Sequence, residues 1–213
     1  MAAQALSCAT PMVFVIDDDV SVRESLELLI SCAGWQPETF VCAEEFLARP
    51  RLIAPSCLVL DVNLPDLNGL ELQNRLADRS DMPIIFITGY GDVPMTVRAM
   101  KAGAAEFLTK PFSDDLLLSV IRHAIERSRH ALDLETEMGE LRECYASLSR
   151  REREVMALVV TGLLNKQVGA ELGISEITVK AHRGKVMRKM KADSLADLVK
   201  MAARLHLAPA LEG

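Results

Sequence analysis

Short apolar runs that each end near a polar residue constrain the fold of this 213-residue chain more than any other feature. Four such runs lie in the first 110 residues, and the polar residues that follow them are Asp17, Asp61, Thr88 and Lys110. The runs at residues 13–16 and 84–87 do not alternate with polar residues, which is typical of strands buried on both faces. Amphipathic stretches separate the runs. Strand–helix alternation of this kind predicts a parallel sheet covered by helices on both sides.

The first 125 residues contain five strand–helix units, which predict an α/β domain with a flavodoxin-like five-stranded parallel sheet. We predict strands at residues 12–17, 39–41, 57–61, 84–88 and 106–108. We predict helices at residues 21–33, 43–48, 69–77 and 93–102, and a further helix that begins near Asp114. Ser21 and Glu24 have the spacing of a capping box, which places the start of the first helix at Ser21.

From Ser149 onward the sequence predicts only helices, the first of them opened by a capping box at Ser149. A short helix at residues 165–172 precedes Gly173, and a helix capped by Ser175 continues to about Met190. This succession is typical of a helix-turn-helix motif. We therefore predict a first domain at residues 1–125, a long helical linker at 126–148 and an all-α four-helix domain at 149–213.

The linker carries apolar residues at alternating spacings of four and three. They are Leu134, Met138, Leu141, Tyr145 and Leu148. This is the a/d pattern of a coiled coil, but it covers only about two heptads. Two interpretations stay open: an amphipathic helix that lies on its own domain, which we favour, and a dimeric coiled coil, in which Gly139 is a weak point.

Charge is distributed unevenly along the chain. Residues 1–125 contain 17 acidic and 9 basic residues, a net charge of −8, whereas residues 149–213 contain 7 acidic and 12 basic residues, a net charge of +5. Only the second domain has the charge expected of a partner for a polyanion such as DNA. The net charge of −6 for the whole chain hides this division.

Composition argues against a membrane protein, a secreted protein and a zinc site. The longest apolar runs have the length of strands, far below the ~20 residues of a membrane-spanning helix. The first ten residues lack the basic region of a secretory signal. The five cysteines show no Cys-x-x-Cys spacing, which predicts buried free thiols. We expect a cytoplasmic protein with no membrane contact.

The polar residues after the strands suggest a site for a divalent cation and a phosphoryl group. Asp17, Asp18 and Asp61 would repel one another unless a cation such as Mg²⁺ and Lys110 neutralise them. An Asp carboxylate is a competent nucleophile toward phosphorus, and it forms an aspartyl phosphate. Thr88 and Lys110 could then bind the phosphoryl oxygens. The alternative is that these acids only cap a helix or form a turn, but their coincidence at several strand ends argues against it.

Two sets of motifs resemble one known family. In the first domain they are residues 15–19, residues 58–61 with Pro65 and Gly69, residues 87–89, residues 110–112 and the stretch 91–104. In the second domain they are residues 151–155, Gly162-Leu163, Asn165-Lys166 and residues 174–182. The chain resembles two-component response regulators of the NarL/FixJ family, with a FixJ-like receiver domain followed by a LuxR-type helix-turn-helix. The resemblance covers about residues 12–205, and the two halves occur in the family's order.

The resemblance implies a role for each residue at the sheet edge. Asp61 would be the phosphoacceptor, and Thr88 and Lys110 would bind the phosphoryl group. The Mg²⁺ ligands would be Asp17, Asp18, Asp61 and the backbone carbonyl of Asn63. Asp19 would be an accessory acid that caps the first helix.

The resemblance also implies a conformational switch. Thr88 would move toward the phosphoryl group, and Phe107 would rotate inward in response. From the sequence alone, Phe107 is an apolar strand residue for which core packing is the ordinary interpretation. Asn63 and Tyr90 occupy family positions that influence the lifetime of the phosphoryl group.

Cations gather on the second helix of the predicted helix-turn-helix, at Lys180, Arg183, Lys185, Arg188, Lys189 and Lys191. The resemblance places DNA contacts at Asn165, Lys166, Thr178, Lys180, Ala181, Arg183, Gly184 and Lys189. A solvated charged face is the ordinary alternative, but the positive charge of the whole domain favours phosphate contacts. The base-reading positions of the family match Lys180, Ala181 and Gly184. Only Lys180 can hydrogen-bond a base, so we expect DNA shape to supply much of the specificity.

We predict a phosphorylation-dependent DNA-binding transcriptional regulator. A sensor histidine kinase would phosphorylate Asp61, and two chains would pair through the helix at 93–102, the strand at 106–108 and the helix from Asp114. The homodimer would bind two half-sites of double-stranded promoter DNA, and RNA polymerase is a further partner that this role allows. An apolar stripe on the last helix would be part core and part dimer contact; it comprises Leu195, Leu198, Val199 and Ala202.

We do not expect an enzyme beyond self-phosphoryl transfer and slow autodephosphorylation. A small phosphatase with an aspartyl-phosphate intermediate would need a second acid two residues after Asp61, where this chain has Asn63. A third hypothesis keeps DNA binding but makes the first domain a dimerisation module that is never phosphorylated. The complete set of acids, Thr88 and Lys110 argues against it.

Overall fold

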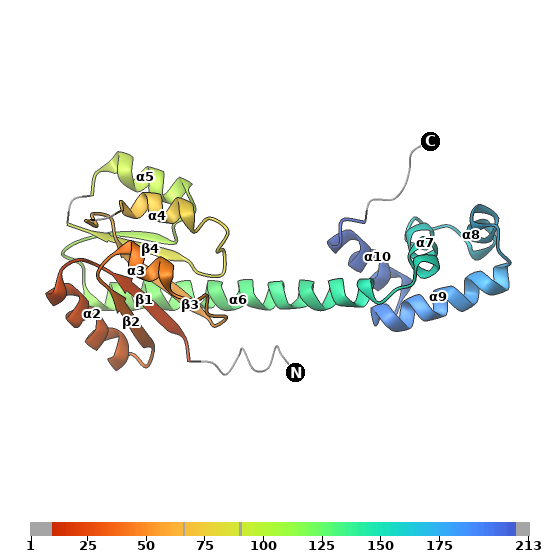
Figure 1. Ribbon diagram of the computed structural model, residues 1–213, viewed down its shortest axis with the longest axis horizontal. Coiled ribbons are helices and arrows are strands. Elements are labelled where there is room, and N and C mark those ends of the chain that lie inside the picture. The colour runs from red at the N-terminus through yellow and green to blue at the C-terminus, as the bar shows by residue number, and fades with distance from the viewer. Residues whose placement is uncertain (1–9, 66, 90, 208–213) are drawn as a thin grey trace. The chain divides into compact units, whose positions relative to one another are not determined.

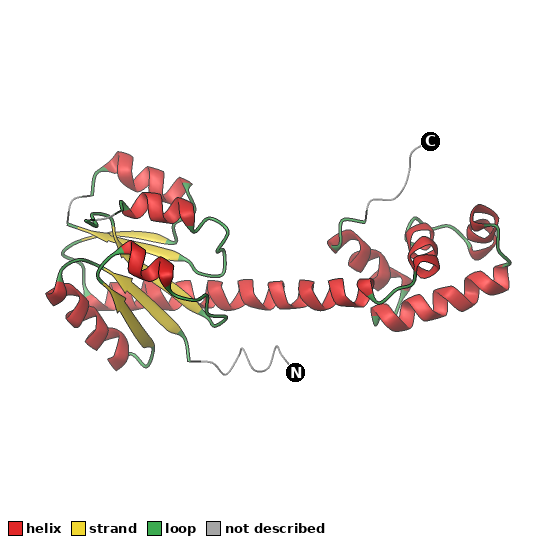
Figure 2. Ribbon diagram, viewed as in Figure 1, coloured by secondary structure: helices red, strands yellow, loops and turns green. Residues whose placement is uncertain are grey.

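The computed structural model describes residues 10–65, 67–89 and 91–207, and the chain divides into two compact units, Met1–Leu134 and Glu135–Gly213 (Figures 1 and 2). The first unit is built around a sheet and the second contains only helices. In the part of the chain that the structure describes, no helix is both long and apolar enough to cross a membrane.

The first unit contains a five-stranded parallel sheet with the strand order β2-β1-β3-β4-β5. The strands are β1 Met12–Ile16, β2 Gln36–Phe40, β3 Ser56–Asp61, β4 Ile84–Thr88 and β5 Glu106–Thr109. Parallel pairing brings the carboxyl ends of β1, β3 and β4 to one edge, because Ile16 is in register with Leu60 and Asp61 with Ile87. This order and direction confirm the predicted flavodoxin-like fold.

Helices cover both faces of this sheet (Figure 1). They are α2 Val20–Cys32, α3 Ala43–Ala48, α4 Gly69–Arg75, α5 Val93–Lys101 and α6 Asp114–Ala146. Side chains alternate along each strand, so Phe14 packs with α3, α4 and α5 on one face, and Val15 packs with α2 and the start of α6 on the other. The uninterrupted apolar runs predicted central strands for this reason.

Two predictions about the strands and helices of this unit differ from the structure. The second strand was expected at residues 39–41 but spans Gln36–Phe40. It is an edge strand that pairs only with β1, so it needs no buried apolar run, and Pro37 is tolerated there. The first helix is capped by Asp19, as the resemblance implied, and not by Ser21 as the capping-box spacing predicted: an Asp19 carboxylate oxygen accepts hydrogen bonds from the backbone N–H groups of Ser21 and Val22. Asp19 prevails because it has the extended backbone that an N-cap requires.

Four helices follow α6 in the second unit and surround one apolar core. They are α7 Arg150–Val159, α8 Asn165–Leu172, α9 Glu176–Met190 and α10 Leu195–Arg204. The predicted capping box of Ser149 and Glu152 opens α7, and Ser175 caps α9. Gly173 ends α8 with a left-handed backbone (φ of 65°), a conformation that glycine adopts readily. The predicted four-helix helix-turn-helix domain is confirmed.

The apolar repeat of the linker packs into the core of this second unit. Leu141 and Leu148 are buried there, and Met138 and Tyr145 pack against the same cluster. Only Leu134, which belongs to the first unit, has an exposed side chain among the five repeat positions. The heptad spacing is thus accounted for by packing of residues 135–148 within the second unit.

The cysteines are free thiols at the four described positions, as expected from their spacing. Only Cys57 is buried, whereas Cys32 is exposed and Cys42 and Cys144 are half-buried. The prediction that all are buried was therefore wrong, and Cys8 lies outside the described residues. Cys57 alone occupies a sheet position between two helical layers.

Candidate functional site: an acidic cluster at the sheet edge and a basic helix

Three strands position the core of the candidate site. Asp17 follows β1, Asp61 ends β3 and Thr88 ends β4, so all three meet at the carboxyl edge of the sheet. Asp17 and Thr88 are fully buried and Asp61 is 8% exposed. The backbone N–H of Lys110 donates to the carbonyl oxygen of Thr88, which fixes the start of the β5–α6 turn beside them.

The charged groups of this edge lie in direct contact. Carboxylate oxygens of Asp17, Asp18 and Asp61 lie within 4.8 Å of one another. The Nζ atom of Lys110 lies 2.8 Å from Oδ2 of Asp17 and 3.6 Å from Oδ2 of Asp61. Three carboxylates face one ammonium, so the cluster has an excess of negative charge. An all-oxygen donor set of this kind fits a hard divalent cation such as Mg²⁺.

Burial and charge oppose each other in this cluster. Desolvation raises the pKa of Asp61 above its ordinary value, although the charge of Lys110 and the backbone N–H of Asn63 act to lower it. For Lys110, burial acts to lower the pKa, but the hydrogen bond and the charges of Asp17 and Asp61 outweigh it and raise the pKa. Lys110 therefore stays cationic, and its positive charge favours the ionised form of Asp61 against the effect of burial on the Asp61 pKa.

Arg23 supports the acidic turn, and the sequence did not indicate this role. Its Nη1 atom donates to the backbone carbonyls of Asp17 at 2.7 Å and Asp18 at 2.9 Å. The contact orients the peptide groups that carry two of the acids. Its only sequence signal is a basic residue in the first helix, one helical turn after the Asp19 cap.

The loop after β3 is closely packed. The backbone N–H of Asn63 lies 3.3 Å from Oδ1 of Asp61 and donates to it. A Cβ atom at Gly69, the first residue of α4, would lie 2.7 Å from the carbonyl oxygen of Asp61, so only glycine fits without displacement. The predicted metal contact of the Asn63 carbonyl stays a prediction, and Tyr90 lies outside the described residues.

Phe107 and Thr88 both border Gly91. A Cβ atom there would lie 3.0 Å from Cε1 of Phe107, 3.0 Å from Cγ2 of Thr109 and 3.4 Å from Cγ2 of Thr88. The Phe107 ring is half-buried, and its centroid lies 6.0 Å from that of Phe86. The predicted switch residues thus share one tightly packed neighbour.

The predicted DNA-contacting residues lie on α8 and α9 of the second unit. Thr178, Lys180, Ala181 and Gly184 are exposed on α9, and Lys166 is exposed on α8. Arg183 is half-buried, and its Nη1 atom donates to Oδ1 of Asn165 at 3.2 Å, a bond that joins α9 to α8. Nζ of Lys180 lies 3.2 Å from an oxygen of Glu176 one turn earlier. His182 is half-buried, in keeping with a packing role.

Lys189 differs from the other cations of α9. Its Nζ atom bonds to the nearly buried carboxylate of Glu152 and to the carbonyl of Ser147, at 2.7 and 2.9 Å. The pKa of Glu152 falls to about 2, first because of the Lys189 hydrogen bond and then because of the Ser149 backbone N–H. This pairing gives Lys189 a structural role, and its predicted DNA contact stays a prediction.

Comparison with known protein families agrees with both units. The family described as response regulator receiver domain matches residues 13–122, and the family described as bacterial regulatory proteins, luxR family, matches residues 146–202. The pair defines a class in which a receiver domain precedes a LuxR-type helix-turn-helix. This chain belongs to that class: it is a transcriptional response regulator of a two-component system.

Individual relatives match over nearly the whole chain. Nodulation protein W of Bradyrhizobium diazoefficiens is 51% identical over 197 residues, which cover 92% of this chain and 87% of the relative. The response regulator TodT of Pseudomonas putida is 44% identical, with coverage of 94% and 88%. The solved structure of the response regulator StyR superposes with a TM-score of 0.82 at 47% identity, and covers 92% of this chain and 100% of its own.

Proposed function

We propose that Asp61 is the residue at which this regulator is phosphorylated. The contact of Asp61 with Lys110, beside the buried Asp17 and Thr88, carries the proposal. An Asp61 oxygen attacks the phosphorus of the donor, the bond from phosphorus to the donor breaks, and an aspartyl phosphate remains. Lys110 neutralises the added charge, and the Thr88 hydroxyl donates to a phosphoryl oxygen.

Mg²⁺ is the cation that we assign to the acidic cluster, with Asp17, Asp18, Asp61 and the Asn63 carbonyl as its ligands. Carboxylate oxygens clustered within 4.8 Å support this assignment. Bound there, the ion would offset the negative charge shared by the acids and the incoming phosphoryl group. The chain's own chemistry is limited to accepting the group and hydrolysing it slowly, because Asn63 offers no second acid.

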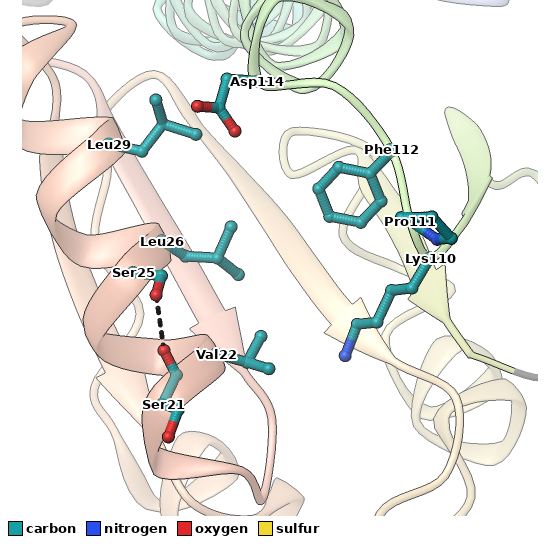
Figure 3. A pocket seen from close by; sticks show the side chains of 9 residues that line it. All are labelled: Ser21, Val22, Ser25, Leu26, Leu29, Lys110, Pro111, Phe112 and Asp114. Carbon is teal, nitrogen blue, oxygen red and sulfur yellow. Dashed lines mark hydrogen bonds between the residues drawn. The ribbon is translucent and has the colours of Figure 1, made fainter.

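A sensor histidine kinase is the phosphodonor in this proposal, and a pocket beside Lys110 suits its docking. The pocket has a volume of about 400 Å³ and lies between α2 and the β5–α6 turn. Figure 3 shows Val22, Leu26 and Leu29 of α2 on one side and Phe112 on the other, with Lys110 nearby. Apolar walls next to the reactive edge would let an apolar helix surface of the kinase bring its phosphohistidine to Asp61.

Phosphorylation would then promote pairing through the face of α5, β5 and α6. Thr88 and Phe107 link that face to Asp61 in the proposed switch. Val93 (76% exposed), Val97 and Met100 form an exposed apolar stripe along α5 at spacings of four and three. In the second unit, Leu198 and Ala202 are core residues, whereas the exposed Leu195 and Val199 are available to a partner chain. The homodimer would place two α9 helices on successive half-sites of promoter DNA, where RNA polymerase is the further partner.

One experiment tests this function. Protein mass, molar mass by light scattering and operator binding are measured with and without a small phosphodonor and Mg²⁺. We expect wild type to gain the mass of one phosphoryl group, to dimerise and to bind more tightly, and Asp61→Asn to do none of these. Asp78→Asn, a change of the same type at an exposed position after α4, should behave as wild type. Wild type that gains no mass, or Asp61→Asn that gains as much, contradicts the proposal.

A further inference from the structure

Ile177, on the solvent face of α9, is an exposed apolar side chain that the function above does not explain. Ile177, Ala181 and Gly184 follow one another at spacings of four and three, so they share one face of the helix. Val179, Val186 and Met190 are buried on the opposite face. Ile177 is 80% exposed, more than any other large hydrophobic side chain among the described residues. Core packing therefore does not account for this isoleucine.

Basic side chains surround this face of α9. The helical spacing places Lys180 on one side of it and Lys185 on the other, and Arg188 continues it one turn further; all three are exposed. The domain that carries them has a net charge of +5. A surface with cations around an apolar centre complements duplex DNA, in which phosphates border a groove, better than it complements an ordinary protein surface.

The major groove offers one apolar group on the edges of its base pairs, the 5-methyl group of thymine. We propose that Ile177, together with Ala181, recognises thymine methyl groups in each half-site. Gly184 lies in open space and presents only backbone, which leaves room for the helix to approach the base edges. Lys180, which lies 3.2 Å from Glu176 on the exposed side of the helix, can add a hydrogen bond to a base, and the apolar side chains supply the contacts that it cannot make. The inference rests on the proposed DNA-binding function and names its specificity.

The test begins with the full-length protein treated with phosphodonor and Mg²⁺. Operators are selected from a random pool of duplex DNA, and each thymine of the selected half-site is then replaced by deoxyuridine, which removes only the methyl group. We expect thymines at the positions that face the first two turns of α9. Affinity should fall by about fourfold for each contacted methyl, since this is the effect of one buried carbon group.

The variant Ile177→Ala closes a double-mutant cycle with these operators. Because Ile177 is exposed, the change should leave the fold intact. In this variant, replacing the contacted thymine by deoxyuridine should no longer reduce the affinity for DNA, because the methyl group has lost its partner. Ile53→Ala is the matched control: it is the same change at a 66% exposed isoleucine of the first unit. This control should keep the wild-type affinity and the full effect of methyl removal.

The inference is overturned if removing every methyl leaves affinity unchanged, or if Ile177→Ala retains the full deoxyuridine effect. It is also overturned if Ile177→Ala binds like wild type but fails to support transcription by RNA polymerase, because Ile177 would then contact protein. In each of these cases wild type still binds DNA, and the proposed function stands. Wild type that binds no duplex from the pool contradicts the proposed function itself.

Discussion

The Nζ atom of Lys189 on α9 lies 2.7 Å from a carboxylate oxygen of Glu152 on α7. The carboxylate is nearly buried, and it also accepts the backbone N–H of Ser149 in the capping box. One acid thus fixes the start of α7 and the end of the recognition helix together. The Lys189 contact is local to the second unit and needs neither DNA nor phosphorylation.

Replacing Lys189 by Met should loosen this unit. The change removes a charged hydrogen bond to a buried acid. Because the lysine is partly exposed, we expect the free energy of unfolding of this unit to fall by roughly 1–2 kcal/mol. Hydrogen exchange of the α7 and α9 amides should accelerate accordingly. Lys185→Met, at an exposed position of the same helix, serves as the control and should leave exchange unchanged. Equal exchange in both variants would remove the structural role from Lys189.

Acid should weaken the second unit through Glu152. Its folded pKa of about 2 lies below the ordinary glutamate value of 4.5, so the ionised form stabilises the folded state. That contribution is fully present above about pH 4.5 and is lost as the pH falls toward 2. Glu152→Gln should therefore flatten the dependence of α7 and α9 exchange protection on pH across this window. A variant with the wild-type dependence would show that another group titrates there.

Lys110→Met should shift the pH dependence of phosphorylation upward. Burial already raises the pKa of Asp61, and Lys110 is the largest influence that lowers it. Without the lysine, more of Asp61 is protonated at a given pH, and a protonated carboxyl is a poor nucleophile. The rate at which the protein gains the mass of a phosphoryl group from a small phosphodonor is measured at a series of pH values. The pH at which this rate is half its maximum is the midpoint. Lys101→Met on α5 should leave the midpoint in place.

Gly91→Ala should separate phosphorylation from its effect. The new methyl group would press on Phe107 and Thr109, which hinders movement of Phe107. Asp61 should still be phosphorylated, but the gain in dimerisation, which for coupled sites is typically about 5- to 150-fold, should be largely lost. Light scattering with and without phosphodonor measures this gain in dimerisation. Gly89→Ala is the control, since a Cβ there meets nothing within 4 Å. A full dimerisation response in Gly91→Ala would place the switch elsewhere.

Lys166→Ala should reduce the salt dependence of DNA binding. Each phosphate contact releases counterions, so losing one should lower the slope of log affinity against log salt by about 1, with sequence preference unchanged. Affinities measured over a range of salt concentrations provide the slope. Lys200→Ala, on the exposed side of α10, should keep the wild-type slope. An unchanged slope in Lys166→Ala would exclude it from the DNA contact.

The sequence predicted what depends on local pattern. Apolar runs followed by Asp17, Asp61 and Thr88 predicted both the central strands and their shared edge, since parallel strands align their carboxyl ends. The second strand was predicted in the wrong place because its position is set by pairing with β1, and Gln36 and Pro37 give no apolar pattern that would indicate a strand.

Contacts between distant segments were beyond local pattern. The heptad spacing predicted a face on the linker helix, but only the folded unit identifies the core that covers it. Arg23 and Lys189 each carry a charge whose partner is visible only in three dimensions. Exposure of Ile177 is of the same kind, because an isoleucine in a helix is assigned to the core by default.

The two faces of α9 are encoded by separate residues, and this has a consequence for how such a regulator can diversify. Val179, Val186 and Met190 hold the helix in place, while Ile177, Ala181 and Gly184 are exposed on its outer face. Substitutions at exposed positions usually change stability by about 0.5 kcal/mol or less. If the outer face reads the operator as proposed, two or three changes there would give a duplicated copy of this chain a different operator. The residues that hold the fold and those at the sheet edge of the first unit would be unchanged.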